Sequence, residues 1–93
     1  MGDWKFAQAN RGQQLAKLHQ FSVVKRQGEK EIEFQITVRE YANPADPPLA
    51  FFAQADKETN QNSAPYRPHG WGGSLLDALA ACIREIERFP YEG

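Results

Sequence analysis

The sequence predicts an α+β fold, in which an antiparallel sheet of three to four strands carries one C-terminal helix on one face. Two patterns lead to this prediction. Residues 31–39 and 49–55 send alternate side chains to opposite faces, as half-buried strands do. Residues 74–89 instead repeat apolar side chains at the period of a helix. The order β-β-β-α fits a single domain over residues 1–93, which is long enough for one modest core.

The helix is expected to begin after Ser74 and to end before Pro90. A serine hydroxyl at the N-cap can accept a hydrogen bond from a free backbone N–H of the first turn. Asp77 follows three residues later, where a carboxylate favours the positive end of the helix. The apolar face of this helix comprises Leu75, Leu79, Cys82, Ile86 and Phe89, widened by Leu76 and Ile83.

Residues 19–41 are predicted to form a β-hairpin. With a two-residue turn at Gln27 and Gly28, Phe21 would face Phe34 across the two strands. The apolar sides of the hairpin and of the third strand would then form the surface that the helix covers. The residues expected there are Phe21, Val23, Ile32, Phe34, Ile36, Leu49 and Phe51.

Two segments leave alternatives open. Residues 1–18 are compatible with a short edge strand through Trp4 and Phe6, followed by a turn. The third strand, 49–55, places Phe52 on the face away from the helix. This aromatic side chain could contact another subunit, or the N-terminal segment could cover it.

Residues 56–73 are predicted to be a long polar loop, and loops of this length in small domains are usually functional or disordered. Its second half concentrates aromatic residues and one cation just before the start of the helix, where backbone N–H groups are free, a mixture that suits recognition. The competing interpretation is that Tyr66 and Trp71 fold back as a lid over the edge of the core. With Phe52 from the third strand, the candidate binding residues are Phe52, Tyr66, Arg67, His69 and Trp71.

The net charge of −1 is unevenly distributed. Residues 1–30 hold six basic and two acidic side chains, whereas residues 31–63 hold two basic and six acidic ones. The overall balance argues against a general nucleic-acid binder but leaves a local basic patch. A single cysteine, the absence of an apolar signal region and the lack of a run of about 20 apolar residues indicate a cytoplasmic protein without membrane contact.

The sequence shows no pattern typical of a catalytic site. The stretch 70–74 contains two closely spaced glycines before a helix, but it lacks the lysine of a phosphate-binding loop. Cys82 lies on the predicted buried face of the helix, and no His, Cys or carboxylate spacing suits a metal. We therefore expect no catalytic residues, no metal and no cofactor.

The segment Gly73–Leu79 resembles the stretch that opens the helix of HicB-like antitoxin domains: a glycine, a serine or threonine, leucine, an acidic residue, and then Ala-Leu. The strand at 49–56 stands in the corresponding place, so the resemblance covers residues 49–86. It implies the fold and a protein-binding role, but not toxin neutralisation. The chain departs from that family in its long 56–73 connection, in lacking a Pro-Gly turn before the helix, and in having no appended operator-binding segment.

The leading functional hypothesis is a small, non-catalytic protein-interaction module that self-associates as a homodimer, with an antitoxin-like role as one form of it. Self-association is expected because the strand at 49–55 carries no charge that would protect an unpaired sheet edge, and two-fold dimers are the commonest oligomers. The alternative is a single-stranded nucleic-acid binder that combines the basic N-terminal third with Phe52, Tyr66 or Trp71 as stacking platforms.

Overall fold

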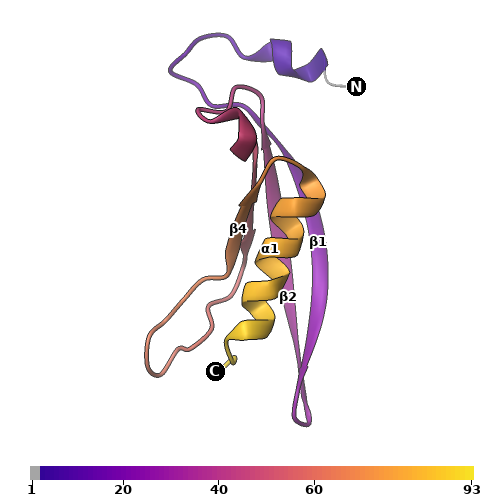
Figure 1. Cartoon of the computed structure of the whole chain (residues 1–93), viewed down its shortest axis with the longest axis vertical. Helices are drawn as coiled ribbons and strands as arrows, with labels where there is room; N and C mark the ends of the chain where they lie inside the picture. Colours follow the sequence, from indigo (N-terminus) through magenta and orange to yellow (C-terminus); the bar gives the residue numbers. More distant parts are fainter. Residues whose placement is uncertain (1–2) are drawn as a thin grey trace.

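The computed structural model describes residues 3–93 and confirms the predicted α+β architecture. Four antiparallel strands lie in the order β1-β2-β3-β4, and α1 packs on one face of the sheet (Figure 1). The elements are η1 (Asp3–Ala7), β1 (Ala16–Gln27), β2 (Lys30–Tyr41), η2 (Pro47–Leu49), β3 (Phe51–Ala55), β4 (His69–Gly72) and α1 (Leu75–Arg88), where η denotes a short 3₁₀ helix.

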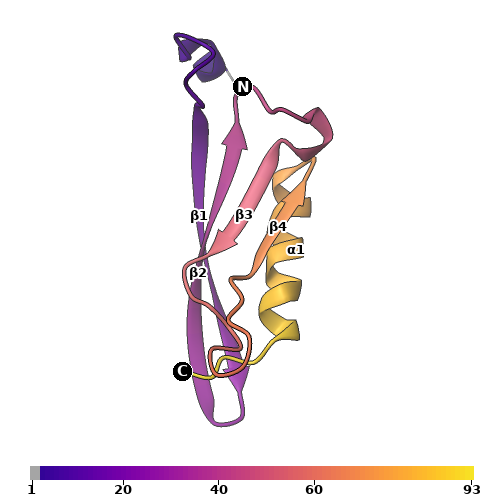
Figure 2. The same cartoon turned by 90° about the vertical axis from the view of Figure 1, so that its left-hand side faces the viewer.

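The molecule is elongated, with principal extents of 48 × 25 × 19 Å. The long hairpin of β1 and β2 forms its main axis, and the shorter β3 and β4 extend the sheet to one side (Figure 2). The helix packs mainly on β4 and β3 and barely reaches β1. The helix-covered half of the sheet therefore lies at the β4 edge, and β1 forms the opposite, uncovered edge.

The hairpin register differs from the predicted one by two residues. Gly28 and Glu29 form the turn, so that Phe21 pairs with Ile36 rather than with Phe34. Gly28 adopts a φ of +63°, which glycine accepts without a steric penalty and which the first position of a type II′ hairpin turn requires. Because the shift is two residues and not one, every side chain of the hairpin remains on its predicted face.

The core lies between α1 and the facing side of β2 and β3. Of the residues predicted to be covered, Phe21 and Leu49 remain largely exposed, and Leu76 on the helix is 72% exposed. The prediction was wrong for Leu76 because α1 presents Ala78 to the sheet in its place. It was wrong for Phe21 because α1 barely reaches β1, and for Leu49 because this residue lies in η2, before β3 begins. The buried apolar residues are Ile32, Phe34, Ile36, Val38, Ala53, Ala55, Ala78, Cys82 and Ile86.

Two glycines of β4 explain why the helix sits where it does. A Cβ atom at Gly70 would lie 2.5 Å from the Cβ of Ala81 and 2.7 Å from the backbone oxygen of Ala78. At Gly72 it would lie 2.7 Å from the backbone nitrogen of Ala78. Distances this short are not tolerated between such atoms, so both positions need glycine for α1 to approach the strand. The glycine-rich stretch before the helix thus has a packing role.

Both ends of α1 are capped by side chains. The backbone N–H of Asp77 donates to Ser74 Oγ at 3.1 Å, which confirms the predicted N-cap. At the other end, the ammonium group of Lys25 on β1 donates to the backbone carbonyls of Ile86 (2.8 Å) and Phe89 (2.7 Å). Lysine at this end satisfies free carbonyls and complements the negative end of the helix dipole. It also ties β1 to the helix.

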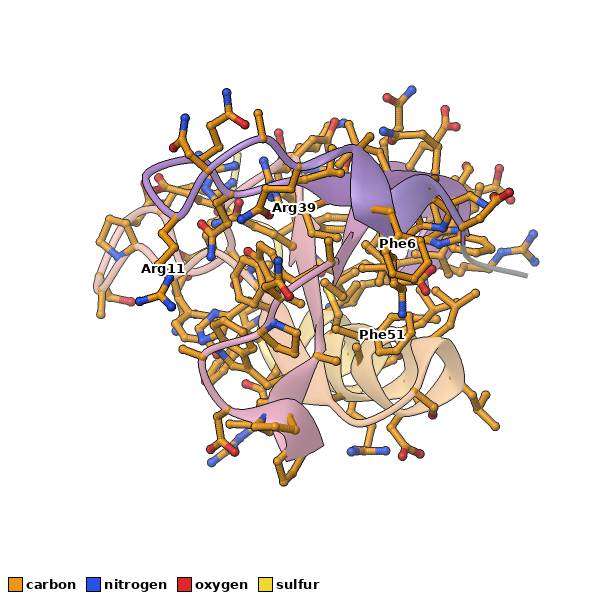
Figure 3. The ribbon with its side chains drawn as sticks, turned by 90° about the horizontal axis from the view of Figure 1, so that it is seen from above. Phe6, Arg11, Arg39 and Phe51 are labelled. Carbon is orange, nitrogen blue, oxygen red and sulfur yellow. The ribbon has the colours of Figure 1, made fainter. Side chains whose placement is uncertain are left out.

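The edge strand predicted through Trp4 and Phe6 is wrong, whereas residues 16–18 belong to β1; residues 1 and 2 lie outside the described part. Residues 3–7 form η1, and the side chains of Gln8, Asn10 and Gln13 then satisfy nearby backbone N–H groups, so no partner strand is needed. Viewed along the long axis, Phe6 lies on the same side of the molecule as Phe51, and Arg11 lies on the other side (Figure 3).

Candidate functional site

Part of the second half of the predicted 56–73 loop is a strand. Residues 69–72 form β4 and pair with β3, so the expectation of an irregular loop is wrong for them. Upstream, Thr59 and Tyr66 form an isolated bridge through two backbone hydrogen bonds of 2.7 and 2.9 Å. These contacts close the remaining loop upon itself and hold the start of β4 in place.

The sheet pairing gathers aromatic side chains on the face opposite α1. Phe52 lies directly between Arg39 of β2 and Trp71 of β4, and the rings of Phe52 and Trp71 have centroids 4.5 Å apart. Tyr41 stacks beside Trp71 with a centroid distance of 6.4 Å and an interplanar angle of 22°. We call this surface the aromatic face. It comprises Tyr41, Phe52, His69 and Trp71, with Tyr66 at its rim.

Two hollows open on the aromatic face. The larger has a volume of about 450 Å³, and all five candidate binding residues line it. Its full lining is Phe52, Gln54, Pro65, Tyr66, Arg67, His69 and Trp71. The smaller, of about 320 Å³, is lined by Gln14, Tyr41, Pro44, Ala45, Asp46, Leu49 and Trp71. Trp71, which is 48% exposed, borders both hollows and therefore stands at the centre of the surface.

Sequence reasoning missed two parts of this surface: Tyr41, and the proline loop, by which we mean residues 43–48 with Pro44, Pro47 and Pro48. Tyr41 could have been found from the alternation of β2, because it shares a face with Arg39, two residues earlier. The proline loop carried no such signal, since its position depends on how η2 leads into β3. The smaller hollow is a consequence of tertiary structure that local patterns do not encode.

Arg67 and Tyr66 hold the rim of the larger hollow. Arg67 Nη1 donates to the backbone carbonyls of Ala55 (3.2 Å) and Asp56 (2.8 Å), which fixes the guanidinium against the end of β3. The ring of Tyr66 packs on that of Phe89, with centroids 4.9 Å apart, as the lid interpretation expects. Trp71 does not follow that interpretation, because it lies on the open face of the sheet.

Of the two alternatives for Phe52, cover by the N-terminal segment is wrong, and contact with another subunit stays a prediction. Its ring is half-buried against Trp71 of β4, and not under the N-terminal segment. The sequence-based prediction lacked β4, and this strand supplies Trp71 as the neighbour of Phe52. Phe52 thus forms the floor of the surface, and Trp71 is its accessible part.

Two titratable groups in or beneath the site, Tyr66 and Cys82, have raised pKa values. Partial burial, together with the neighbouring Glu85 carboxylate, raises the pKa of Tyr66, so its hydroxyl remains protonated at neutral pH. Burial raises the pKa of the Cys82 thiol to about 12, and its sulfur lies 3.6 Å from the Pro68 carbonyl, to which it donates. A buried, protonated thiol is a poor nucleophile. Residues 3–93 bring together no group of three side chains able to hold a metal ion.

Comparison with protein-family models, curated proteins and solved structures gave no match to this chain. The resemblance of residues 49–86 to HicB-like antitoxin domains therefore stays a prediction that rests on the residues alone. Within residues 3–93, no helix is both long enough and apolar enough to cross a lipid bilayer.

Proposed function

We propose that this chain is a small, non-catalytic protein-interaction module whose contact surface is the aromatic face. The observation that carries the proposal is the position of Trp71, half-exposed between two hollows and backed by Phe52. Tryptophan and tyrosine at the centre of an interface contribute a large share of binding energy. A central tryptophan with hollows on either side offers a partner both an anchor and two recesses to fill.

The aromatic face is held in place before any partner arrives. Gly70 and Gly72 let α1 pack tightly on β4, and Trp71 lies between them on the opposite side of the strand. Phe52 supports the indole ring from β3. Because little ordering is needed on binding, more of the contact energy remains available as affinity.

The chemistry of the reactive side chains supports a non-catalytic role. Cys82 is buried and protonated, and His69 Nδ1 lies 2.9 Å from the backbone carbonyl of Arg67. The protonated thiol is a poor nucleophile, and in the described part of the chain His69 has no hydrogen bond to a serine, threonine or cysteine side chain that it could activate. A single unpaired cysteine supports a cytoplasmic location as part of the same proposal.

Self-association is the second part of the proposal, but its structural basis changes. The strand expected to form the open edge, β3, lies inside the sheet between β2 and β4. The two edges are β4, with four residues, and β1, with twelve. Sheet edges invite pairing with another chain, so self-association remains our proposal, and an antitoxin-like homodimer that binds a protein through the aromatic face is one form of it.

The contact surface can be tested with a displayed library of peptides selected on the wild-type chain. We expect the selected peptides to lose at least roughly thirtyfold in affinity for a Trp71→Ala variant, as hot-spot residues do. The matched control is Leu76→Ala, which removes an exposed apolar side chain from α1, outside the aromatic face. If Trp71→Ala binds every selected peptide as the wild type does, the aromatic face is not the contact surface.

A specific observation keeps single-stranded nucleic acid as a second candidate. Arg39 lies directly opposite Phe52 on the open face and has no ion-pair partner among residues 3–93. A cation beside aromatic rings is the combination that single-strand binders use. Fluorescence anisotropy with a short labelled oligonucleotide, at about 50 and 200 mM salt, separates the candidates. Salt-sensitive binding that is lost in Arg39→Ala would favour nucleic acid, whereas no binding at the lower salt concentration would favour the protein module.

A further inference from the structure

We propose that β1 pairs antiparallel with β1 of a second copy of this chain, about a two-fold axis that passes through Phe21. This inference rests on the self-association part of the proposed function and names the element, the partner and the register. The aromatic face takes no part in it, because β1 and β4 are opposite edges of the sheet.

The free edge of β1 offers a full set of backbone groups. The β1–β2 ladder continues beyond the strands, where the N–H of Ala42 donates to the carbonyl of Leu15 at 2.9 Å. Since bonded positions alternate in an antiparallel pair, the odd-numbered residues of β1 bond to β2. Even-numbered residues, including Leu18, Gln20, Ser22 and Val24, therefore direct their N–H and C=O groups outward.

The same edge exposes three large apolar side chains. Leu18 is 54%, Phe21 36% and Val24 57% exposed. Leu18 and Val24 lie on the open face, whereas Phe21 lies on the helix side, where α1 does not extend far enough to cover it (Figure 2). An edge with unpaired backbone and apolar side chains on both faces is one that another strand would complete.

The sequence of β1 is self-complementary in one register. With the axis at Phe21, this residue meets its own copy, and Leu18 meets Val24 of the second copy. An axis at Ser22 would instead place Leu18 against Arg26, and an axis at Gln20 would place it against Ser22. Only the Phe21 axis among these three pairs all the exposed apolar side chains of the strand with one another.

The charges of β1 do not prevent two copies from meeting. The strand has three basic residues and no carboxylate, so self-pairing requires that each charge be compensated within its own chain. Lys25 is 6% exposed and directs its ammonium group onto carbonyls at the end of α1. Arg26 forms an ion pair with Glu31. In this register Lys17 faces Lys25 of the second copy, whose ammonium group is held by the carbonyls at the end of its own α1 rather than directed across the pair. The outer edge therefore presents mainly backbone and apolar groups.

The resulting dimer would have one continuous eight-stranded sheet. Because the two-fold axis is perpendicular to the sheet, both helices lie on one side and both aromatic faces lie on the other. The dimer would thus present two contact surfaces to partners in the same direction, which would increase avidity for a partner with two matching sites.

Disulfide trapping tests the register. In a pair without mutual hydrogen bonds, the Cα atoms lie about 4.5 Å apart, which is within the range a disulfide can bridge. We expect Phe21→Cys to form covalent dimers under mild oxidation. Ser22→Cys is the matched control, because its two copies would be diagonal neighbours about 7–8 Å apart. The native Cys82 is buried and protonated, so it does not compete.

Sedimentation equilibrium on the intact chain tests the interface itself. We expect a dimer mass for the wild type at micromolar concentration, a folded monomer for Val24→Lys, and a dimer for the exposed-site control Leu76→Lys. A monomeric wild type, or equal cross-linking of Ser22→Cys and Phe21→Cys, would overturn the inference. So would a dimer that Trp71→Ala dissociates while Val24→Lys leaves it intact, although that result would still place self-association on the aromatic face.

Discussion

Both faces of the sheet carry aromatic and apolar side chains, but those on one face are buried and those on the other are partly accessible. On the side under α1, β2 contributes Ile32, Phe34, Ile36 and Val38, all of them buried. On the other side the same strand contributes charged and polar residues together with Tyr41, and β3 and β4 add Phe52 and Trp71. One set of aromatic and apolar side chains stabilises the fold, and the other remains partly accessible. Accessible aromatic side chains gathered on an otherwise polar face are typical of a contact surface.

The largest expected effect compares one phenylalanine from each face. Phe34→Ala should lower the free energy of unfolding by roughly 3–5 kcal/mol, because the fully buried ring leaves a cavity that the core cannot close. Phe52→Ala should cost markedly less, since its ring is only half-buried. Urea denaturation of both variants measures the difference. Equal losses would mean that Phe52 belongs to a second core and that the aromatic face is not a surface.

The next largest effect concerns the close packing of α1 on β4, which places the helix over one half of the sheet. Gly70→Ala should cost roughly 1–3 kcal/mol, because the added methyl group must push α1 away from β4. Gly93→Ala is the control, as a Cβ there meets nothing within 4 Å. Thermal unfolding of the two variants would reveal the effect, and a Gly70→Ala variant as stable as the wild type would show that α1 and β4 are not in close contact.

A smaller effect concerns the start of the helix. Ser74→Ala should cost about 1 kcal/mol, because the backbone N–H of Asp77 loses the hydroxyl that accepts its hydrogen bond. The midpoint of chemical denaturation should fall accordingly, while Ser74→Asp should restore most of the loss. An unchanged midpoint would show that the Ser74 cap does not stabilise the start of α1.

The smallest expected effect on stability at neutral pH comes from the thiol of Cys82, on the side of the sheet that α1 covers. Its pKa of about 12 in the folded chain lies above the ordinary value of 9.0, so the folded state holds the proton more tightly. This contribution to stability is complete below about pH 9 and is lost as the pH rises toward 12. The wild type should therefore lose more stability than Cys82→Ala between about pH 8 and pH 10. If the stability of the wild type and that of Cys82→Ala fell equally over this pH range, the thiol would not be buried.

Sequence patterns predicted the elements with the clearest periodicity. The helix after Ser74 and the two faces of the hairpin follow from period 3.6 and period 2, and the structure confirms both. The hairpin register was wrong by two residues because alternation determines the face of a side chain but not its partner. The turn at Gly28 decides that partner, and two neighbouring turns satisfied the same pattern.

The strand β4 was missed for a physical reason. Its sequence alternates glycine with His69 and Trp71, and glycine is a poor strand former when judged locally. The glycines are required by the helix that packs against them, which is a contact between elements. All five candidate binding residues nevertheless line one hollow, because a cluster of large side chains near a helix start was a chemical signal that did not depend on the secondary structure.

The most direct test of the account is the accessibility of Trp71 during self-association, in a Trp4→Phe variant that leaves Trp71 as the only indole. Iodide quenching of its fluorescence would be followed from dilute monomer to concentrated dimer. If β1 forms the dimer and the aromatic face stays free for a partner, Trp71 should be quenched equally well at both ends of the series. An indole that is already shielded in the monomer, or that becomes shielded as the dimer forms, would contradict this division between the two surfaces.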